Sequence, residues 1–191
     1  EMVGRAVRQS LVVVDMPFPT NHLGVHKAVE NAGRILKESR CQAVELEGGA
    51  EQAQVIAGLV SAGIPVMAHV GLRPQSVHQM GGYKVQRDRE QLLRDSTAAQ
   101  DAGAFAIVLE CIPAALAAEI TQRLSIPTIG IGAGNGTDAQ VLVWSDLMGL
   151  TPNAPRLAKA YRNLRAEISA GVDEWAKDVA SGVFPGVEQS Y

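Results

Sequence analysis

Two acidic side chains interrupt an apolar run in the segment AVELEGG, residues 43–49. Glu45 and Glu47 are two positions apart, so on a β-strand they would lie on the same face. A pair of acids at the end of a buried strand is costly unless it meets a metal ion, another cation or water. Barrel enzymes place their catalytic groups at such strand ends. The segment is therefore a candidate site, and a solvated strand end before a Gly-Gly turn is the alternative.

Three further ionisable side chains stand where an apolar run ends. Asp15 follows LVVV, His69 comes near the end of IPVMAHVG, and Glu110 ends AFAIVLE. Oxygen ligands suit Mg²⁺, and desolvation in an apolar strand is expected to raise the pKa of Glu110, as a general base requires. Each residue alone also has a structural explanation, because Asp15 could cap a turn and His69 could be a hydrogen-bonded buried histidine.

Helical patterns alternate with these apolar runs, which predicts a parallel sheet covered by helices. A closed barrel would gather the acids and the histidine over one mouth, whereas an open doubly wound sheet would spread them. We therefore predict a (βα)8 barrel. Six strands are visible, the last in residues 139–150, and two helices are expected from Ala154 onward. Since a complete barrel needs about 250 residues, we predict a single domain over residues 1–191 from which two strands are missing.

The composition narrows the class of function. The chain has 191 residues, a net charge of −3 and 47% hydrophobic residues. No basic stripe or polybasic segment predicts binding to nucleic acid or to a membrane, so small-molecule chemistry is favoured. Cys41 and Cys111 have no C-x-x-C spacing, which argues against a disulfide framework and a zinc site and favours reduced thiols in the cytoplasm.

Several motifs together are similar to one known family. They are VVVDMPF, VELEGG, HVGLRPQSV followed by GGYKVQ, VLECIP, IPTIGIGAGN and SGVFPGVEQSY, and they extend over nearly the whole chain. This set resembles the ketopantoate hydroxymethyltransferases of pantothenate biosynthesis. The resemblance implies that a hydroxymethyl group passes from 5,10-methylenetetrahydrofolate to α-ketoisovalerate through a magnesium-stabilised enolate. It also implies a (βα)8 barrel and a homodecamer.

The resemblance implies a role for each candidate residue. Asp15 would bind Mg²⁺ directly and contact the substrate, and Glu47 would act through a metal-bound water. Glu110 would be the general base, and His69 would contact the substrate's oxygen atoms. Glu45 stands where the family usually has a substrate-binding lysine, so we expect its carboxylate to face, and to repel, an anionic keto acid.

A second departure from the family leaves other functions open. The family begins with two more strands, and a Gly-Asp-Ser run after the second supplies a metal-binding aspartate that does not occur here. A magnesium-dependent keto-acid lyase or mutase barrel would share the metal and the enolate without needing a folate. A non-catalytic, degenerate homologue would keep only the barrel scaffold and its assembly.

Overall fold

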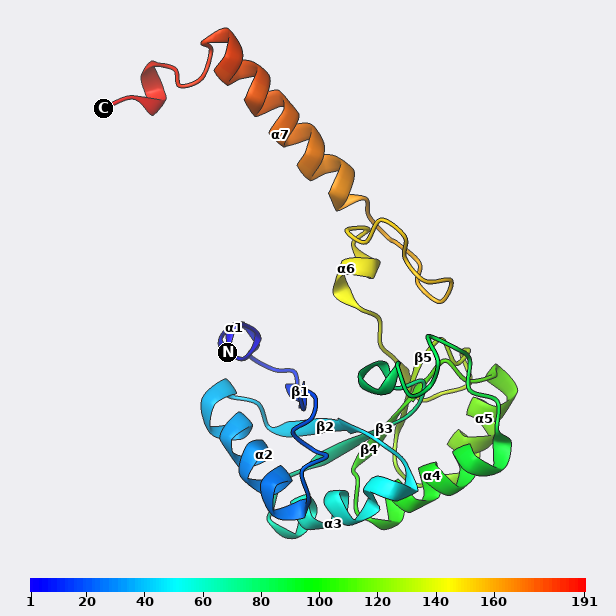
Figure 1. Ribbon diagram of the computed structural model, residues 1–191. Coiled ribbons are helices and arrows are strands. Elements are labelled where there is room, and N and C mark those ends of the chain that lie inside the picture. The colour runs from blue at the N-terminus through cyan, green and yellow to red at the C-terminus, as the bar shows by residue number, and fades with distance from the viewer. The chain divides into compact units, whose positions relative to one another are not determined.

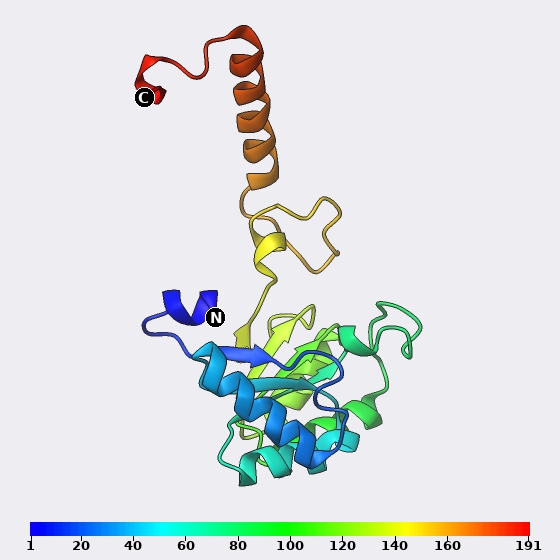
Figure 2. The same ribbon diagram turned by 60° about the vertical axis from the view of Figure 1, so that its left-hand side comes forward.

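The computed structural model describes residues 1–191, which divide into two compact units, Glu1–Val141 and Leu142–Tyr191. Each unit is described by itself below. The prediction of one domain over the whole chain stays a prediction. Figures 1 and 2 show the first unit as a sheet with its main helices gathered on one side.

The six strands of the first unit form one parallel sheet in the order of the chain. They are β1 (Val13–Asp15), β2 (Ala43–Glu47), β3 (Val66–Gly71), β4 (Ala106–Glu110), β5 (Thr128–Ile131) and β6 (Ala139–Gln140). Every neighbouring pair is parallel. A doubly wound sheet would reverse its strand order partway, whereas a barrel adds each strand beside the last. The predicted barrel-type fold is therefore confirmed, with six strands.

Helices follow most of the strands and cover one face of the sheet. They are α2 (Val25–Ser39), α3 (Ala53–Ser61), α4 (Arg89–Asp101) and α5 (Ala114–Arg123), with the short helix α1 (Met2–Ala6) before β1 and the 3₁₀ turns η1 (Ala50–Gln52) and η2 (Pro74–Ser76) after β2 and β3. Gly58 shows how closely two helices approach, because an added Cβ there would lie 2.3 Å from a methyl carbon of Val25. The helices α2 and α3 are therefore packed tightly against each other at this point.

Strand alternation divides the apolar residues between the two faces of the sheet. The helix-facing side chains, Val44, Leu46, Val66, Ala68, Val70, Ile107 and Leu109, belong to the main buried core. The opposite face has its own smaller cluster of Met67, Ala106 and Val108, with Val13, Ile129 and Ile131 packed beside it. This second face corresponds to the interior of a barrel. The acidic residues and the histidine at the strand ends lie on it.

The sixth strand is much shorter than the sequence predicts. The strand β6 ends at Gln140, and Val141 and Val143 beyond it are exposed. The prediction of a strand through residues 139–150 is wrong after Gln140, since no strand follows β6 to bury its apolar side chains.

The second unit contains α6 (Trp144–Leu147), α7 (Leu164–Ser181) and a final 3₁₀ turn, η3 (Val187–Gln189). The expectation of two helices from Ala154 onward is wrong, because the Asn163 side chain accepts a hydrogen bond from the backbone N–H of Ala166 and so fixes one helix start there. Gly182, with a φ of 76°, ends α7. Neither this helix nor any other has the length and apolar character that crossing a bilayer requires.

Candidate active site

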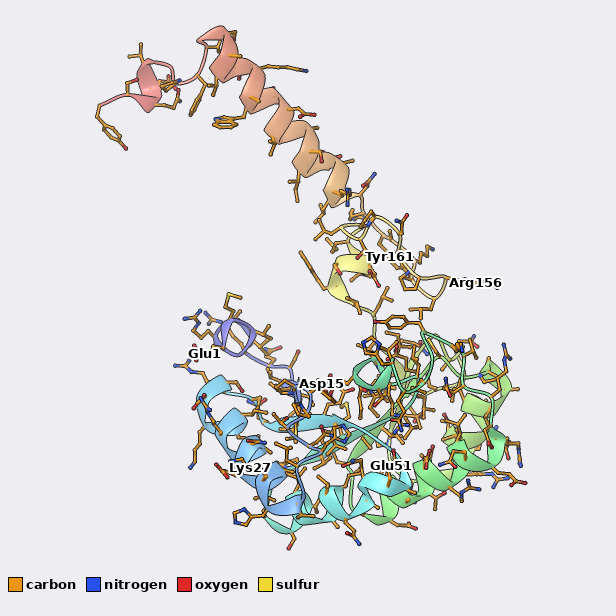
Figure 3. The ribbon with its side chains drawn as sticks, in the orientation of Figure 1. Glu1, Asp15, Lys27, Glu51, Arg156 and Tyr161 are labelled. Atoms are coloured by element: carbon orange, nitrogen blue, oxygen red, sulfur yellow. The ribbon has the colours of Figure 1, made fainter.

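The structure brings all five predicted site residues to one edge of one face. Asp15 pairs in register with Glu45 across β1 and β2, and Glu47 pairs with His69 across β2 and β3. Glu110 ends β4 beside the last residue of β3. Their positions place the side chains on the face away from the helices. Figure 3 shows Asp15 on that side of the sheet and Lys27 on α2, across the sheet from it.

His69 lies between two carboxylates on neighbouring strands. Its Nδ1 is 3.1 Å from Oε1 of Glu45, and its Nε2 is 3.2 Å from Oε2 of Glu110. At these distances each ring nitrogen is close enough to its carboxylate for a strong attraction between opposite charges. A neutral imidazole would turn a bare nitrogen lone pair towards one of these anions, which favours the protonated ring. We call these three residues the histidine group.

The pKa of His69 reflects this position. Burial alone would lower the pKa of the imidazole, which has only 6% of its side chain exposed, but the carboxylates of Glu110 and Glu45 outweigh burial and raise it to about 10. His69 is therefore an imidazolium at neutral pH. The carboxylate of Glu45 meets this cation, and its expected position facing a keto acid stays a prediction.

Asp15 and Glu47 are joined by a residue from the loop after β3. The side-chain amide nitrogen of Gln75 lies 3.2 and 3.3 Å from the two carboxylate oxygens of Asp15. The backbone N–H of Gln75 donates to Glu47, with distances of 3.1 and 3.3 Å to its two oxygens. We call Asp15, Glu47 and Gln75 the two-acid group.

The two-acid group has no cationic member. Burial, followed by repulsion from Glu45, raises the pKa of Asp15 to about 6. Burial likewise raises the pKa of Glu47 to about 7, against the opposing effects of His69 and the Gln75 N–H. Both shifts show that negative charge is poorly compensated here.

A divalent cation would relieve this excess charge. The oxygen ligands suit Mg²⁺, which commonly uses one or two carboxylates and keeps several waters. No three His, Cys, Asp and Glu side chains converge closely enough to form a metal cage by themselves. With two carboxylates and no third protein ligand of this kind, the group would suit only an ion that takes its remaining ligands from water and substrate, as Mg²⁺ does.

Gln75 is a site residue that sequence reasoning missed. It lies 60 positions from Asp15 and 28 from Glu47, so no local pattern reveals its contacts. Its place in the HVGLRPQSV motif was the available signal. Asn21 was missed too: it is fully buried, and its amide donates to the backbone oxygen of Glu47 at 3.3 Å.

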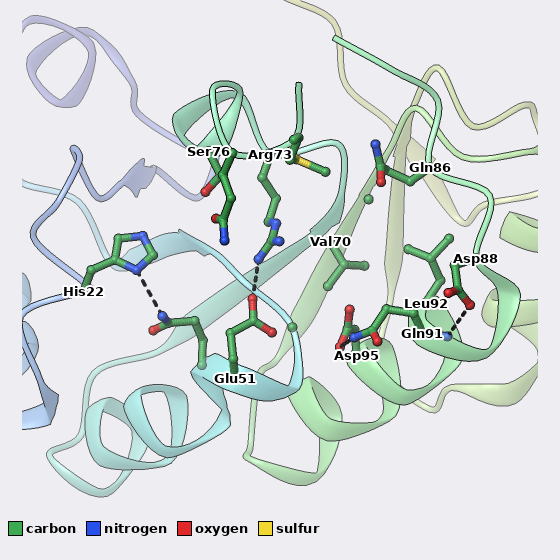
Figure 4. A pocket seen from close by; sticks show the side chains of 15 residues that line it. His22, Glu51, Val70, Arg73, Ser76, Gln86, Asp88, Gln91, Leu92 and Asp95 are labelled. Atoms are coloured by element: carbon green, nitrogen blue, oxygen red, sulfur yellow. Dashed lines mark hydrogen bonds and ion pairs between the residues drawn. The ribbon is translucent and has the colours of Figure 1, made fainter. Parts of the chain in front are cut away.

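A polar cavity of about 390 Å³ lies among the loops after β2 and β3 and the start of α4. Figure 4 shows Arg73 and Glu51 forming an ion pair in its wall, and Asp88 accepting a hydrogen bond from the backbone N–H of Gln91. None of the five predicted site residues lines it. The predicted chemistry therefore belongs to the sheet face rather than to this cavity.

Ionisable side chains collected at the C-terminal strand ends of a barrel-type parallel sheet define an enzyme of the (βα)8 class. The sequence pattern described as ketopantoate hydroxymethyltransferase matches residues 1–187. This chain belongs to that family, and so to a family of transferases.

Individual relatives agree with the family assignment. A 3-methyl-2-oxobutanoate hydroxymethyltransferase from Desulforapulum autotrophicum is 50% identical over 100% of this chain and 73% of its own length. One from Syntrophotalea carbinolica is 52% identical over 99% of this chain and 73% of its own length. The crystal structure of a phosphonopyruvate hydrolase has a TM-score of 0.52 and 15% identity, covering 98% of this chain and 69% of that one. This last likeness concerns the fold alone.

Proposed function

We propose that this protein forms ketopantoate by transferring a hydroxymethyl group from 5,10-methylenetetrahydrofolate to α-ketoisovalerate, as a step of pantothenate biosynthesis. The observation that carries the proposal is the placement of Glu110, as a base, on the same sheet face and edge as the two acids Asp15 and Glu47. Family membership supports the reaction type. The proposal includes a homodecamer in the cytoplasm, which rests on the resemblance alone.

Glu110 acts as the general base. Its carboxylate takes the proton from the β-carbon of the keto acid, and the electron pair of the broken C–H bond then forms the new C–C bond to the methylene carbon of the donor. Both C–N bonds of the methylene bridge break, and the carbon takes its hydroxyl group from water. The two nitrogens of the departing tetrahydrofolate take up the second proton of that water and the proton removed by Glu110, so the step balances. Glu110 has 15% of its side chain exposed, so the base is reachable at the strand end and largely shielded from bulk water.

Asp15 and Glu47 hold Mg²⁺ in this proposal. When bound, Mg²⁺ would draw electron density from the keto-acid oxygens and so acidify the neighbouring C–H bond. Asp15 lies at the solvent-accessible end of β1, so its partly desolvated carboxylate can still reach a cation directly. Glu47 is only 2% exposed, which suits a contact through an ordered water.

His69 supplies the positive charge for the substrate's oxygen atoms. Its contacts with Glu45 and Glu110 support a fixed imidazolium at the centre of the site. The proposed contact between Glu45 and the substrate becomes indirect, because its carboxylate acts by holding the charge and the orientation of His69. With an acid at position 45, the cation of this site is His69, on the neighbouring strand.

A deuterium-exchange assay tests the reaction. The protein is incubated with α-ketoisovalerate and Mg²⁺ in D₂O, and loss of the β-carbon proton signal is followed by NMR. Addition of 5,10-methylenetetrahydrofolate should then yield ketopantoate, detected by mass spectrometry. Exchange without ketopantoate would favour the lyase or mutase alternative, and the absence of both would favour the degenerate homologue.

A further inference from the structure

We propose that Gln75 is a positioning residue that sets the orientation and spacing of Asp15 and Glu47 before a metal ion binds. The inference rests on the proposed function, since it assigns a role in the same metal site. It concerns a side chain with no charge and no direct contact with the reacting atoms.

The hydrogen bonds of Gln75 account for both of its side-chain amide hydrogens. The amide nitrogen lies 3.0 Å from the backbone oxygen of Met16, and it lies at nearly equal distances, 3.2 and 3.3 Å, from the two oxygens of Asp15. One hydrogen can therefore serve Met16 while the other is shared by the carboxylate. The amide thus ties the Asp15 side chain to the backbone that follows it.

The backbone N–H of the same residue reaches Glu47, on the adjacent strand. Its position is set by η2, in which Pro74 precedes it and restricts the backbone. One residue thus fixes two acids that come from different strands. Since each carboxylate oxygen has two lone pairs, these N–H contacts leave lone pairs free for a cation.

The orientation of the amide is determined by its surroundings. Turning it over would place the carbonyl oxygen of Gln75 against the Asp15 carboxylate and the Met16 carbonyl, which are all acceptors. In the observed orientation that carbonyl oxygen is buried and has no hydrogen-bond partner. The observed orientation is therefore the one in which the amide can donate to the Asp15 carboxylate.

Residues that orient metal ligands usually change affinity by about 10- to 100-fold when they are replaced. We therefore expect Gln75→Met, which keeps the length and removes the amide, to weaken Mn²⁺ binding about tenfold or more. The affinity is measured by electron paramagnetic resonance on the full chain, without keto acid or folate. Gln75→Asn, whose amide is withdrawn by one methylene, should weaken binding as well, and it serves if the Met variant does not fold.

Gln79→Met is the matched control, because it makes the same change in the same loop at an exposed position where the side chain makes no hydrogen bond. Its Mn²⁺ affinity should equal that of the wild type. If the wild type binds Mn²⁺ and the folded Gln75 variants bind it equally well, the positioning role is wrong and the proposed function stands. If the wild type binds no Mn²⁺ at millimolar concentration, the metal site and the role of Gln75 are both wrong.

Discussion

The histidine group and the two-acid group lie at the same edge of the same sheet face, yet their negative charges are compensated differently. In the histidine group, Glu45 and Glu110 share the imidazolium of His69. In the two-acid group, Asp15 and Glu47 share only the neutral donors of Gln75. Their formal charges are −1 for the first group and −2 for the second, counting His69 as protonated and all four carboxyl groups as ionised. The negative charge of the histidine group is largely compensated by its own member His69, whereas the two-acid group has no cation to compensate its charge.

This difference agrees with the proposed position of Mg²⁺ at the two-acid group. Burial and neighbouring acids raise the pKa values of Asp15 and Glu47, while contact with two carboxylates raises the pKa of His69. A divalent cation would stabilise the two-acid group, whereas the histidine group already contains a cation, the imidazolium of His69. The division matches a site with a metal on one side and an organic cation beside the base on the other.

The largest expected effect comes from removing the base in the histidine group. Glu110→Gln keeps the shape of the side chain and loses its basicity, so deuterium exchange at the β-carbon of α-ketoisovalerate should fall about 10²-fold or more. NMR in D₂O measures the rate. Metal affinity without substrate should change much less, since Glu110 is outside the two-acid group. An unchanged exchange rate would reject Glu110 as the base.

In the two-acid group, the expected loss is in metal affinity. Asp15→Asn replaces an anionic oxygen with a neutral amide, so Mg²⁺ affinity should fall about 10- to 100-fold. Isothermal titration calorimetry measures it. Asp101→Asn, at the exposed end of α4, makes the same chemical change away from the site and should leave the affinity as it is. Equal losses in both variants would mean that Asp15 does not bind the metal.

Glu45→Lys changes the charge balance of the histidine group. If Glu110 alone keeps His69 protonated, the formal charge of the group rises from −1 to +1. The keto acid α-ketoisovalerate should then bind about tenfold more tightly in the presence of Mg²⁺, equivalent to about 1.4 kcal/mol. Glu38→Lys, on the exposed side of α2, gives the same change in net charge as a control. Weaker binding by the Glu45 variant would show that the carboxylate itself helps to hold the substrate.

The smallest expected effect is on pH-dependent stability. The folded-state pKa of His69, about 10, lies above its ordinary value of 6.5, so its stabilising contribution is complete below pH 6.5 and is lost as the pH rises through about 10. Glu45 and Glu110 face it most closely, and Asp15 and Glu47 add their negative charge nearby.

Glu45→Gln removes one of the two contacting anions and should lower the pKa of His69 by about one unit or more. The loss of stability should then begin at a lower pH. NMR of the His69 ring and denaturant unfolding at pH 7 and pH 9 measure the two effects, and Glu38→Gln is the control. An unchanged His69 titration would mean that Glu45 does not hold the charge of the ring.

Sequence reasoning succeeded where residues close together in the sequence determine the structure. Alternation of side chains along a strand placed Glu45 and Glu47 on one face, and the repeated strand-helix order predicted a barrel-type parallel sheet. It failed at β6, where apolar residues predict a strand that has no further neighbour to pair with. A strand depends on its partner, and the composition of one segment does not reveal the partner.

The sequence by itself determined which residues stand at strand ends, and hence that Asp15, Glu47, His69 and Glu110 share one edge. Only the tertiary structure decided which of them touch. The direction of Glu45 towards His69, and the joining of Asp15 to Glu47 by Gln75, depend on strand register and on a loop 28 and 60 positions away. The energies of charged contacts change steeply with distance and burial, and both quantities are set by packing between elements rather than by neighbours along the chain.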